Sequence, residues 1–507
     1  MVFTKAVMGR LQARAAQFAG RGALIGAALA AVAGCSAIQS ARYHLFGPTG
    51  PNSGTVAGAG GGSVVADEPQ AALVGRDVLA RGGNAADAAA ATGLALGVTL
   101  PSRASYGGGG VCLVARPGQL GQTVTFTGLE NPMAAPFQGH GERPAMTPMT
   151  IRGLYLLQNN FGTVDFNDLL APAIQLATHG TTMSQALSDD LQRVALSFLA
   201  DEQARSVFTK HGNVVLTVGD ELLQPRLGAF LSRLALTGVG DLYNGALSEV
   251  YVNQANNAGA GLTRDDMRHA LAHTEGALEA GVGNAHVSFS GTPNYGGLAA
   301  AMSFMRHVPA QSAAAAWAQS RQHGLPAAQA FLTDGSVSPT SLPALPASTS
   351  FVVTDRKGMA VSCALSENNL FGTGRMAGST GVVLGASPRL YPMPLLASAI
   401  IHDRQGRLMG ALAASGQNDA AQAVADAASR MAAGQMPDMV FQKGGAARLN
   451  AITCSQNPQN LCTGLADPRG HGLASTAGAH AHLDRRHPGL GSEDQLLAHP
   501  VTETVAQ

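Results

Sequence analysis

Residues 81–115 read RGGNAADAAAATGLALGVTLPSRASYGGGGVCLVA. Gly82-Gly83-Asn84 predicts the end of a helix, since Gly and Asn accept the positive φ at which many helices stop. Ala85–Val98 predicts a second helix, so rich in alanine that its neighbours must approach closely. Gly107-Gly108-Gly109-Gly110 then leads into Val111–Ala115, an apolar run typical of a buried strand.

On either side of this stretch, helices and short apolar strands alternate along the chain. We expect an α/β or α+β protein in which helices cover sheets. The predicted helices are 70–81, 85–98, 165–179, 227–236, 246–258 and 420–433. The predicted strands are 286–289, 351–354, 360–366, 382–384 and 408–411.

The composition fits a large folded protein without a nucleic-acid partner. Hydrophobic residues make up 46% of the 507 residues, which excludes a chain disordered throughout. Lys+Arg and Asp+Glu balance at 32 each, whereas nucleic-acid binding favours a basic excess.

The N-terminal residues have the pattern of an export signal. Basic residues precede the apolar run Ala23–Ala33, which is shorter than the roughly 20 residues that span a bilayer. The run ends in Val32-Ala33-Gly34-Cys35, which looks like a lipobox, so we expect a signal at 1–34 and lipid on Cys35. An ordinary signal peptide or a retained anchor are the alternatives. Ser36 after the cysteine suggests a lipoprotein of the outer membrane, facing the periplasm.

Two low-complexity segments flank the predicted folded part. Residues 35–62, rich in Gly, Pro and Ser, predict a linker to the anchor. Residues 476–507 lack an apolar period and predict a disordered tail.

Four cysteines remain if Cys35 carries lipid. Cys112 and Cys363 lie in apolar runs and are expected to be buried thiols. Cys454 and Cys462 flank a polar turn, and in an oxidising compartment that spacing favours a local disulfide over two free thiols.

Several collinear motifs together resemble the gamma-glutamyltranspeptidase family. Four glycines alone would indicate only a flexible loop, and no Lys-Ser/Thr follows to make a phosphate loop. Their separation from the Gly-Gly-Asn-Ala motif makes the resemblance specific. Further matches are Asp168–Ile174, Leu242–Gly245, Leu262–Asp266, Phe371–Gly374 and Asp467–Arg469.

The resemblance implies an α+β fold of the N-terminal-nucleophile hydrolase type, a four-layer αββα sandwich. Members of this family cut their own backbone before a Thr, which here would give a large-subunit-like region 63–347 and a small-subunit-like region 348–475. The implied partners are a small-molecule amide or peptide substrate and the association of the two fragments. No metal or cofactor is implied.

The family's nucleophile segment corresponds to Ser348-Thr349-Ser350-Phe351-Val352-Val353-Thr354-Asp355. Counting back from Asp355 places Ser348 at the nucleophile and Thr349 at a supporting Thr, while a slip of one residue would make Thr349 the nucleophile. We favour Ser348, because a slip also moves side chains to the other strand face. A polar turn without any cleavage is the alternative.

Supporting groups also carry over from the family. Ser366 lies where the family has a Thr near the nucleophile, and Asn368 matches an Asn that binds the polar head of the donor. Ser415-Gly416 falls on paired glycines whose backbone N–H groups form the oxyanion hole.

The donor pocket departs from the family. The Arg that grips the donor carboxylate corresponds to Leu129, and Leu396 and Ala397 replace a hydroxyl pair. We therefore expect a less polar acyl pocket, and Arg389 is the alternative cation for a donor carboxylate.

Two functions remain open from the sequence. One is a self-processing amidohydrolase or acyltransferase acting on γ-glutamyl or related acyl amides such as glutathione-type compounds. The other is a non-catalytic envelope lipoprotein that keeps only the fold.

Overall fold

The computed structural model describes residues 56–57, 61–127, 140–211, 213–291, 295–320, 322–340, 348–391, 394–416, 418–441, 444–455 and 461–477. Cys35, Leu129 and nearly all of the predicted tail therefore lie outside the described residues. Within the part of the chain that is described, no helix combines the length and apolar character needed to cross a bilayer.

Two seven-stranded sheets form the centre of the molecule. Sheet I has the order β1 (Val56–Ala57), β17 (Cys462–Ala466), β16 (Arg448–Cys454), β15 (Leu408–Ser415), β14 (Ala397–Asp403), β11 (Ala285–Phe289) and β10 (Leu278–Val282). Sheet II has the order β18 (Leu473–Thr476), β2 (Ser63–Ala66), β12 (Ser348–Thr354), β13 (Ala360–Ser366), β3 (Gly109–Ala115), β4 (Gln122–Phe126) and β9 (His273–Gly276).

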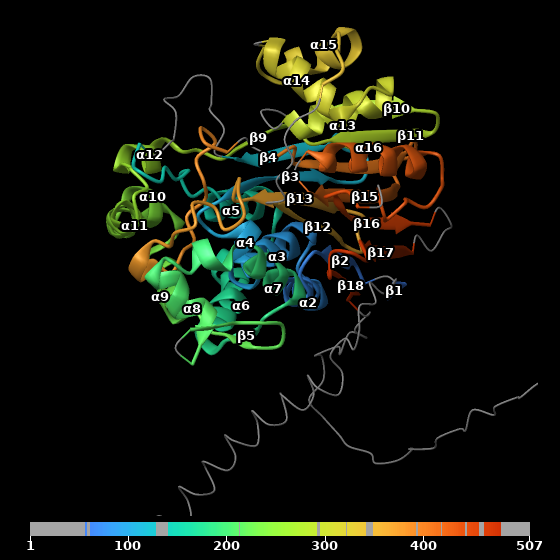
Figure 1. Cartoon of the computed structure of the whole chain (residues 1–507). Coiled ribbons are helices and arrows are strands. Elements are labelled where there is room, and N and C mark those ends of the chain that lie inside the picture. The colour runs from blue at the N-terminus through green and yellow to red at the C-terminus, as the bar shows by residue number, and fades with distance from the viewer. Residues whose placement is uncertain are drawn as a thin grey trace, which may run out of the picture.

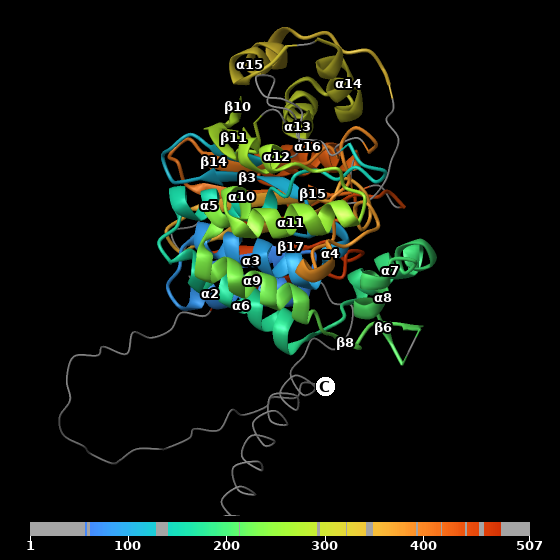
Figure 2. The same ribbon diagram turned by 90° about the vertical axis from the view of Figure 1, so that its left-hand side faces the viewer.

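Helices cover the outer face of each sheet, as Figures 1 and 2 show. Over sheet I lie α13 (Tyr295–Arg306), α14 (Ala310–Ser320), α15 (Leu325–Asp334) and α16 (Asp419–Ala432). On the side of sheet II lie α2 (Pro69–Ala80), α3 (Ala85–Thr99), α4 (Pro101–Ala104), α5 (Thr150–Phe161), α6 (Phe166–His179), α7 (Gln185–Phe198), α8 (Glu202–Phe208), α9 (Pro225–Thr237), α10 (Val239–Asn244), α11 (Ala246–Asn257) and α12 (Arg264–His269). Two small hairpins pair β5 (Thr181–Thr182) with β8 (Glu221–Leu222) and β6 (Thr209–Lys210) with β7 (Val214–Val215).

Three buried apolar layers hold this arrangement together. One lies between the sheets and joins Val65 and Val352 of sheet II to Ile400 and Ile452 of sheet I. The other two lie between each sheet and its helices. The predicted four-layer αββα sandwich is confirmed.

Helix α3 is the central element of the helical layer on sheet II. All its residues are buried, as its alanine content predicted. Gly82 has a φ of +98° and ends α2, whereas Asn84 has a φ of −87° and caps α3 in a capping box with Asp87. The expected helix stop is present, but Asn84 serves the following helix rather than the preceding one.

One sequence expectation about local structure was wrong. Val382–Leu384 is buried but forms only the isolated bridge Met376↔Val383. The prediction failed because a buried loop and a buried strand both show a short apolar run in the sequence. Within the predicted linker 35–62, the two residues of β1 pair with β17 at the edge of sheet I.

The two cysteine pairs lie at opposite positions on neighbouring strands. The predicted Cys454–Cys462 disulfide is present between β16 and β17. Cys112 and Cys363, expected as free thiols, also form a disulfide, between β3 and β13. Their 251-residue separation gives no local signal, because only the strand register brings them together.

In the chain kept uncleaved by Ser348→Ala, we predict that Cys112→Ala/Cys363→Ala lowers the free energy of unfolding by about 2–4 kcal/mol, since a cross-link restricts the unfolded chain more when it closes a longer loop. The control Cys454→Ala/Cys462→Ala opens a separation of only 8 residues and should lower it less. Denaturant unfolding without reductant measures both. A larger loss in the control would contradict the prediction.

Candidate active site

Ser348 is the first residue of β12 and is buried. The backbone N–H of Gly416 donates a hydrogen bond of 3.0 Å to Ser348 Oγ. Ser348 also lies directly opposite Ser366 on the neighbouring strand β13. The structure therefore brings together the sequence-predicted nucleophile, its predicted neighbour and the predicted oxyanion donor.

Gly416 follows the last residue of β15 and needs to be glycine. Its φ is +103°, which disfavours any side chain. A Cβ atom there would also lie 2.3 Å from the carbonyl oxygen of Ala446. Glycine thus allows this N–H group to point at Ser348 Oγ.

Asp67 connects the segments that carry these two groups, and sequence analysis missed it. Asp67 directly follows β2. Its Oδ2 accepts hydrogen bonds from Thr349 Oγ1, Ser350 N and Ser415 Oγ, each at 3.0 Å. Asn450 Nδ2 donates to Oδ1 at 2.7 Å. Burial raises the pKa of Asp67, while the Arg103 cation and the hydrogen bonds act in the opposite direction.

One sequence signal could have drawn attention to Asp67. The signal is an acidic residue directly after the apolar strand 63–66, where the chain is still close to the core. Asp is rarely buried unless its carboxylate has partners. The adjacent Glu68 is the N-cap of α2. In the sequence, the pair Asp67-Glu68 therefore looks like an ordinary acidic helix start.

The contacts of Asp67 also bear on the choice of nucleophile. The Thr349 hydroxyl donates to Asp67, whereas the Gly416 N–H points at Ser348. Ser415, expected beside the oxyanion hole, also uses its hydroxyl to donate to Asp67. This geometry favours Ser348 over the alternative Thr349.

Asn368 is buried just beyond Ser366, in a left-handed backbone conformation with a φ of +60°. Its backbone N–H donates to Ser366 Oγ at 2.8 Å, and its Nδ2 donates to the Ala386 carbonyl at 2.9 Å. The predicted role of Asn368 in binding a donor head remains a prediction, because Asn368 does not line the cavity beside Ser348.

A cavity of about 250 Å³ opens beside Ser348. Its lining residues are Arg103, Ala186, Asp189, Arg193, Ser348, Ser415, Gly416, Gly444, Gly445, Ala446, Arg448, Arg469, Gly470 and His471.

The residues expected to form an apolar acyl pocket do not line this cavity. Leu396 packs against Val111 and Ala364, and Ala397 lies in the core beside sheet I. Arg389, the suggested substitute cation, is exposed and contacts His140 Nδ1 at 3.1 Å, away from the cavity. Arginines from other segments line the cavity, and no spacing in the sequence joins those segments.

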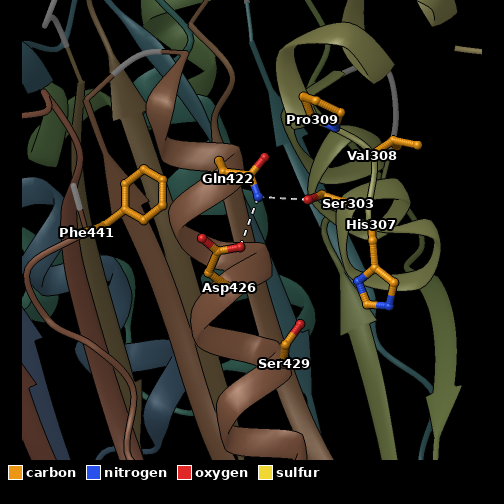
Figure 3. A pocket seen from close by; sticks show the side chains of 8 residues that line it. All are labelled: Ser303, His307, Val308, Pro309, Gln422, Asp426, Ser429 and Phe441. Atoms are coloured by element: carbon orange, nitrogen blue, oxygen red, sulfur yellow. Dashed lines mark hydrogen bonds between the residues drawn. The ribbon is translucent and has the colours of Figure 1, made fainter. Parts of the chain in front are cut away.

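A second cavity of about 380 Å³ lies between α13 and α16 (Figure 3). Gln422 Nε2 crosses it and donates to Ser303 Oγ and Asp426 Oδ1, both at 2.9 Å. Its Ser429 hydroxyl donates to the Ala425 carbonyl within the same helix. This cavity lacks the nucleophile and N–H donor arrangement found at Ser348.

Comparison with known proteins agrees with the fold. A family model described as gamma-glutamyltranspeptidase matches residues 71–336, a little over half of the chain. The chain belongs to the gamma-glutamyltranspeptidase family. The family resemblance predicted from the motifs is therefore confirmed.

Individual members of the family align over part of their length. The glutathione hydrolase proenzyme of Escherichia coli K12 is 31% identical over 220 residues, which cover 41% of this chain and 38% of that protein. Glutathione hydrolase 3 of Arabidopsis thaliana is 31% identical over 216 residues, covering 41% and 34%. The alignment thus spans less than two fifths of either relative.

The likeness of fold extends further than these alignments. A cephalosporin acylase from Bacillus halodurans has a TM-score of 0.67 at 17% identity and covers 85% of this chain and 98% of its own. At that identity the likeness shows a shared fold alone.

Glu367 is a buried carboxyl group between Ser366 and Asn368, near Tyr251 of α11. Burial raises the pKa of Glu367 well above its usual range. The folded protein thus holds this proton more tightly than the unfolded chain. Stability from the protonated group is present at low pH and is lost as pH rises above the usual value for Glu.

We therefore predict that Glu367→Gln becomes more stable relative to the unsubstituted protein as pH rises. The amide cannot ionise, so the variant avoids the loss of about 1.4 kcal/mol per pH unit that this titration produces. Denaturant unfolding between about pH 4 and pH 9 measures the difference, with the exposed Glu249→Gln as control. A difference that stays constant with pH would show that Glu367 does not titrate in this way.

Proposed function

We propose that this chain is a self-processing amidohydrolase or acyltransferase that cleaves its backbone between Ala347 and Ser348 and uses Ser348 as the nucleophile. The observation that carries the proposal is the hydrogen bond of 3.0 Å from the Gly416 N–H to Ser348 Oγ at the wall of a cavity. Serine in place of the family's threonine keeps the reacting hydroxyl.

Cleavage would activate Ser348 by freeing its α-amino group. An α-amine has a pKa of about 8 and can accept the hydroxyl proton near neutral pH, which an amide nitrogen cannot do. Ser348 Oγ then attacks the substrate carbonyl carbon, and the carbonyl oxygen gains negative charge. The Gly416 N–H, held by the backbone, is placed to stabilise that oxyanion.

Collapse of the tetrahedral intermediate breaks the amide bond. The α-ammonium group gives its proton to the leaving amine, and the acyl group stays on Ser348 as an ester. Water completes hydrolysis, or an acceptor amine completes acyl transfer. The balance needs no cofactor.

The substrate class we propose is γ-glutamyl or related acyl amides, including glutathione-type compounds. Support comes from the two relatives named glutathione hydrolases. The alignments cover only part of those proteins, so the substrate belongs to the proposal.

We also propose that the protein is exported and anchored through lipid on Cys35. Two disulfides, Cys112–Cys363 and Cys454–Cys462, support an oxidising compartment. The periplasm at the outer membrane fits this chemistry and the lipobox-like sequence.

We predict that the mature protein gives two fragments on a denaturing gel only after reduction. Cys112 and Cys363 lie on opposite sides of the cleavage point, so their disulfide keeps the fragments joined. N-terminal sequencing of the small fragment should begin at Ser348.

Ser348→Ala should remain one chain with or without reductant, because the nucleophile is missing. Ser362→Ala, a buried serine of β13, serves as the control and should be cleaved normally. A wild-type chain that stays intact would overturn self-processing and favour the fold-only lipoprotein. A fragment beginning at Thr349 would move the nucleophile by one residue.

A further inference from the structure

The cavity beside Ser348 is lined by more positive than negative side chains. Four arginines line it, Arg103, Arg193, Arg448 and Arg469, but only one carboxylate, Asp189. The arginines come from helices α4 and α7, from β16 and from the turn after β17, so no single motif supplies them.

Two of these arginines are neutralised by buried aspartates. Arg103 Nε and Nη2 donate to Asp190 at 2.6 and 2.7 Å. Arg469 Nη2 donates to Asp467 Oδ2 at 2.7 Å. Both pairs are bidentate, and they hold the cavity wall without leaving net charge.

Arg448 differs from these two. Its Nη1 donates to the backbone carbonyls of Gly445, Ala446 and Ala447, at 2.9 to 3.2 Å. Among the described residues, no carboxylate lies within ion-pair distance of Arg448 or of the exposed Arg193. Burial, Arg469 and Arg103 lower the pKa of Arg448 and together outweigh Asp467 and Asp67, which raise it, so an anion placed beside Arg448 would be stabilised.

The strand register places Arg448 next to the reaction centre. Arg448 of β16 lies directly opposite Ser415 of β15, the residue before the Gly416 N–H donor. A molecule whose carbonyl lies between Ser348 and Gly416 could therefore place a second group at Arg448 in the same cavity.

The cavity offers little to an ammonium group. Its single carboxylate, Asp189, lies 3.7 Å from His471 Nε2 and accepts a hydrogen bond of 2.7 Å from Gln185. The surrounding guanidinium groups would repel a second cation.

We propose that the cavity binds a carboxylate at the far end of the donor's acyl group, with Arg448 as its main partner and Arg193 as the second. The inference rests on the proposed function and narrows its substrate class to amides of dicarboxylic acids. Acyl groups without an α-ammonium, such as glutaryl, should be favoured over γ-glutamyl.

Anilide hydrolysis tests whether the bound anion belongs to the acyl group or to the leaving amine of the substrate. We expect kcat/KM for glutaryl p-nitroanilide to exceed that for pentanoyl p-nitroanilide roughly tenfold or more, since a hydrogen-bonded charge contributes more than the matching apolar group. A pentanoyl anilide with a carboxylate on the nitroaniline ring should gain nothing. A gain for that compound instead would overturn the assignment to the acyl group.

The variants locate the effect. Arg448→Met should bring the glutaryl to pentanoyl ratio close to one, while Arg448→Lys should keep part of it. Arg193→Met should lower the ratio less, and the exposed Arg233→Met of α9 serves as control. Active protein that shows no charge preference would overturn the inference and leave the proposed function standing.

A chain that hydrolyses no anilide would count against the proposed function. Calorimetry with glutarate still tests anion binding in the cavity in that case. Glutarate should bind the full chain, and Arg448→Met should weaken binding roughly tenfold or more. If that variant fails to fold, Arg448→Lys and Arg193→Met take its place in the titration. Absent binding, or binding that these substitutions leave unchanged, would overturn the inference.

Discussion

Asp67 accepts hydrogen bonds from Thr349, Ser350 and Ser415 at one carboxylate oxygen and from Asn450 at the other. Thr349 follows the candidate nucleophile Ser348, and Ser415 precedes the candidate oxyanion donor Gly416. These residues belong to strands of two different sheets, so the buried carboxylate fixes the two sheets relative to each other at the candidate site. Apolar packing between the sheets is not directional and could not set the contact between Ser348 and Gly416 alone.

The polarity of the site follows from where the chain places its charges. The motif comparison predicts apolar residues at the family's glutamate-binding positions, whereas the cavity beside Ser348 is lined by arginines from other segments. Asp190 and Asp467 neutralise two of them, which permits several guanidinium groups to share a small space. We therefore propose that the cavity wall at Arg448, rather than the positions that the family motif identifies, sets which acyl groups this chain accepts.

Local patterns predicted much of the fold. Strand β13 has the bounds expected from its apolar run, and α3 and α16 differ by no more than one residue at either end. Collinear motifs predicted the sandwich, and they placed Ser348 and Gly416, which the structure brings together. These features depend on residues close in sequence or on a pattern shared with the family.

The features that sequence analysis missed all depend on contacts between distant strands. The register of β3 and β13 pairs Cys112 with Cys363, and Asp67 is buried by contacts with residues of β12, β15 and β16. The run 382–384 shows the reverse error, because burial alone made a loop resemble a strand. Charge lining the cavity was missed for the same reason, since Arg103, Arg193 and Arg448 share no spacing.

The role of Asp67 is tested most directly by comparing Asp67→Asn with Asp87→Asn in one assay of self-cleavage and anilide hydrolysis. Both aspartates are buried and accept several hydrogen bonds, but Asp87 caps α3 and binds Thr163 rather than the Ser348 strand. In Asp67→Asn an amide nitrogen replaces one of the two carboxylate oxygens. Because all four partners of Asp67 are donors, this nitrogen cannot accept their hydrogen bonds. Cleavage and kcat per folded molecule should fall roughly tenfold to a hundredfold in Asp67→Asn through misplacement of reacting groups, and should be unchanged in Asp87→Asn. Equal activity of the two folded variants would contradict the account.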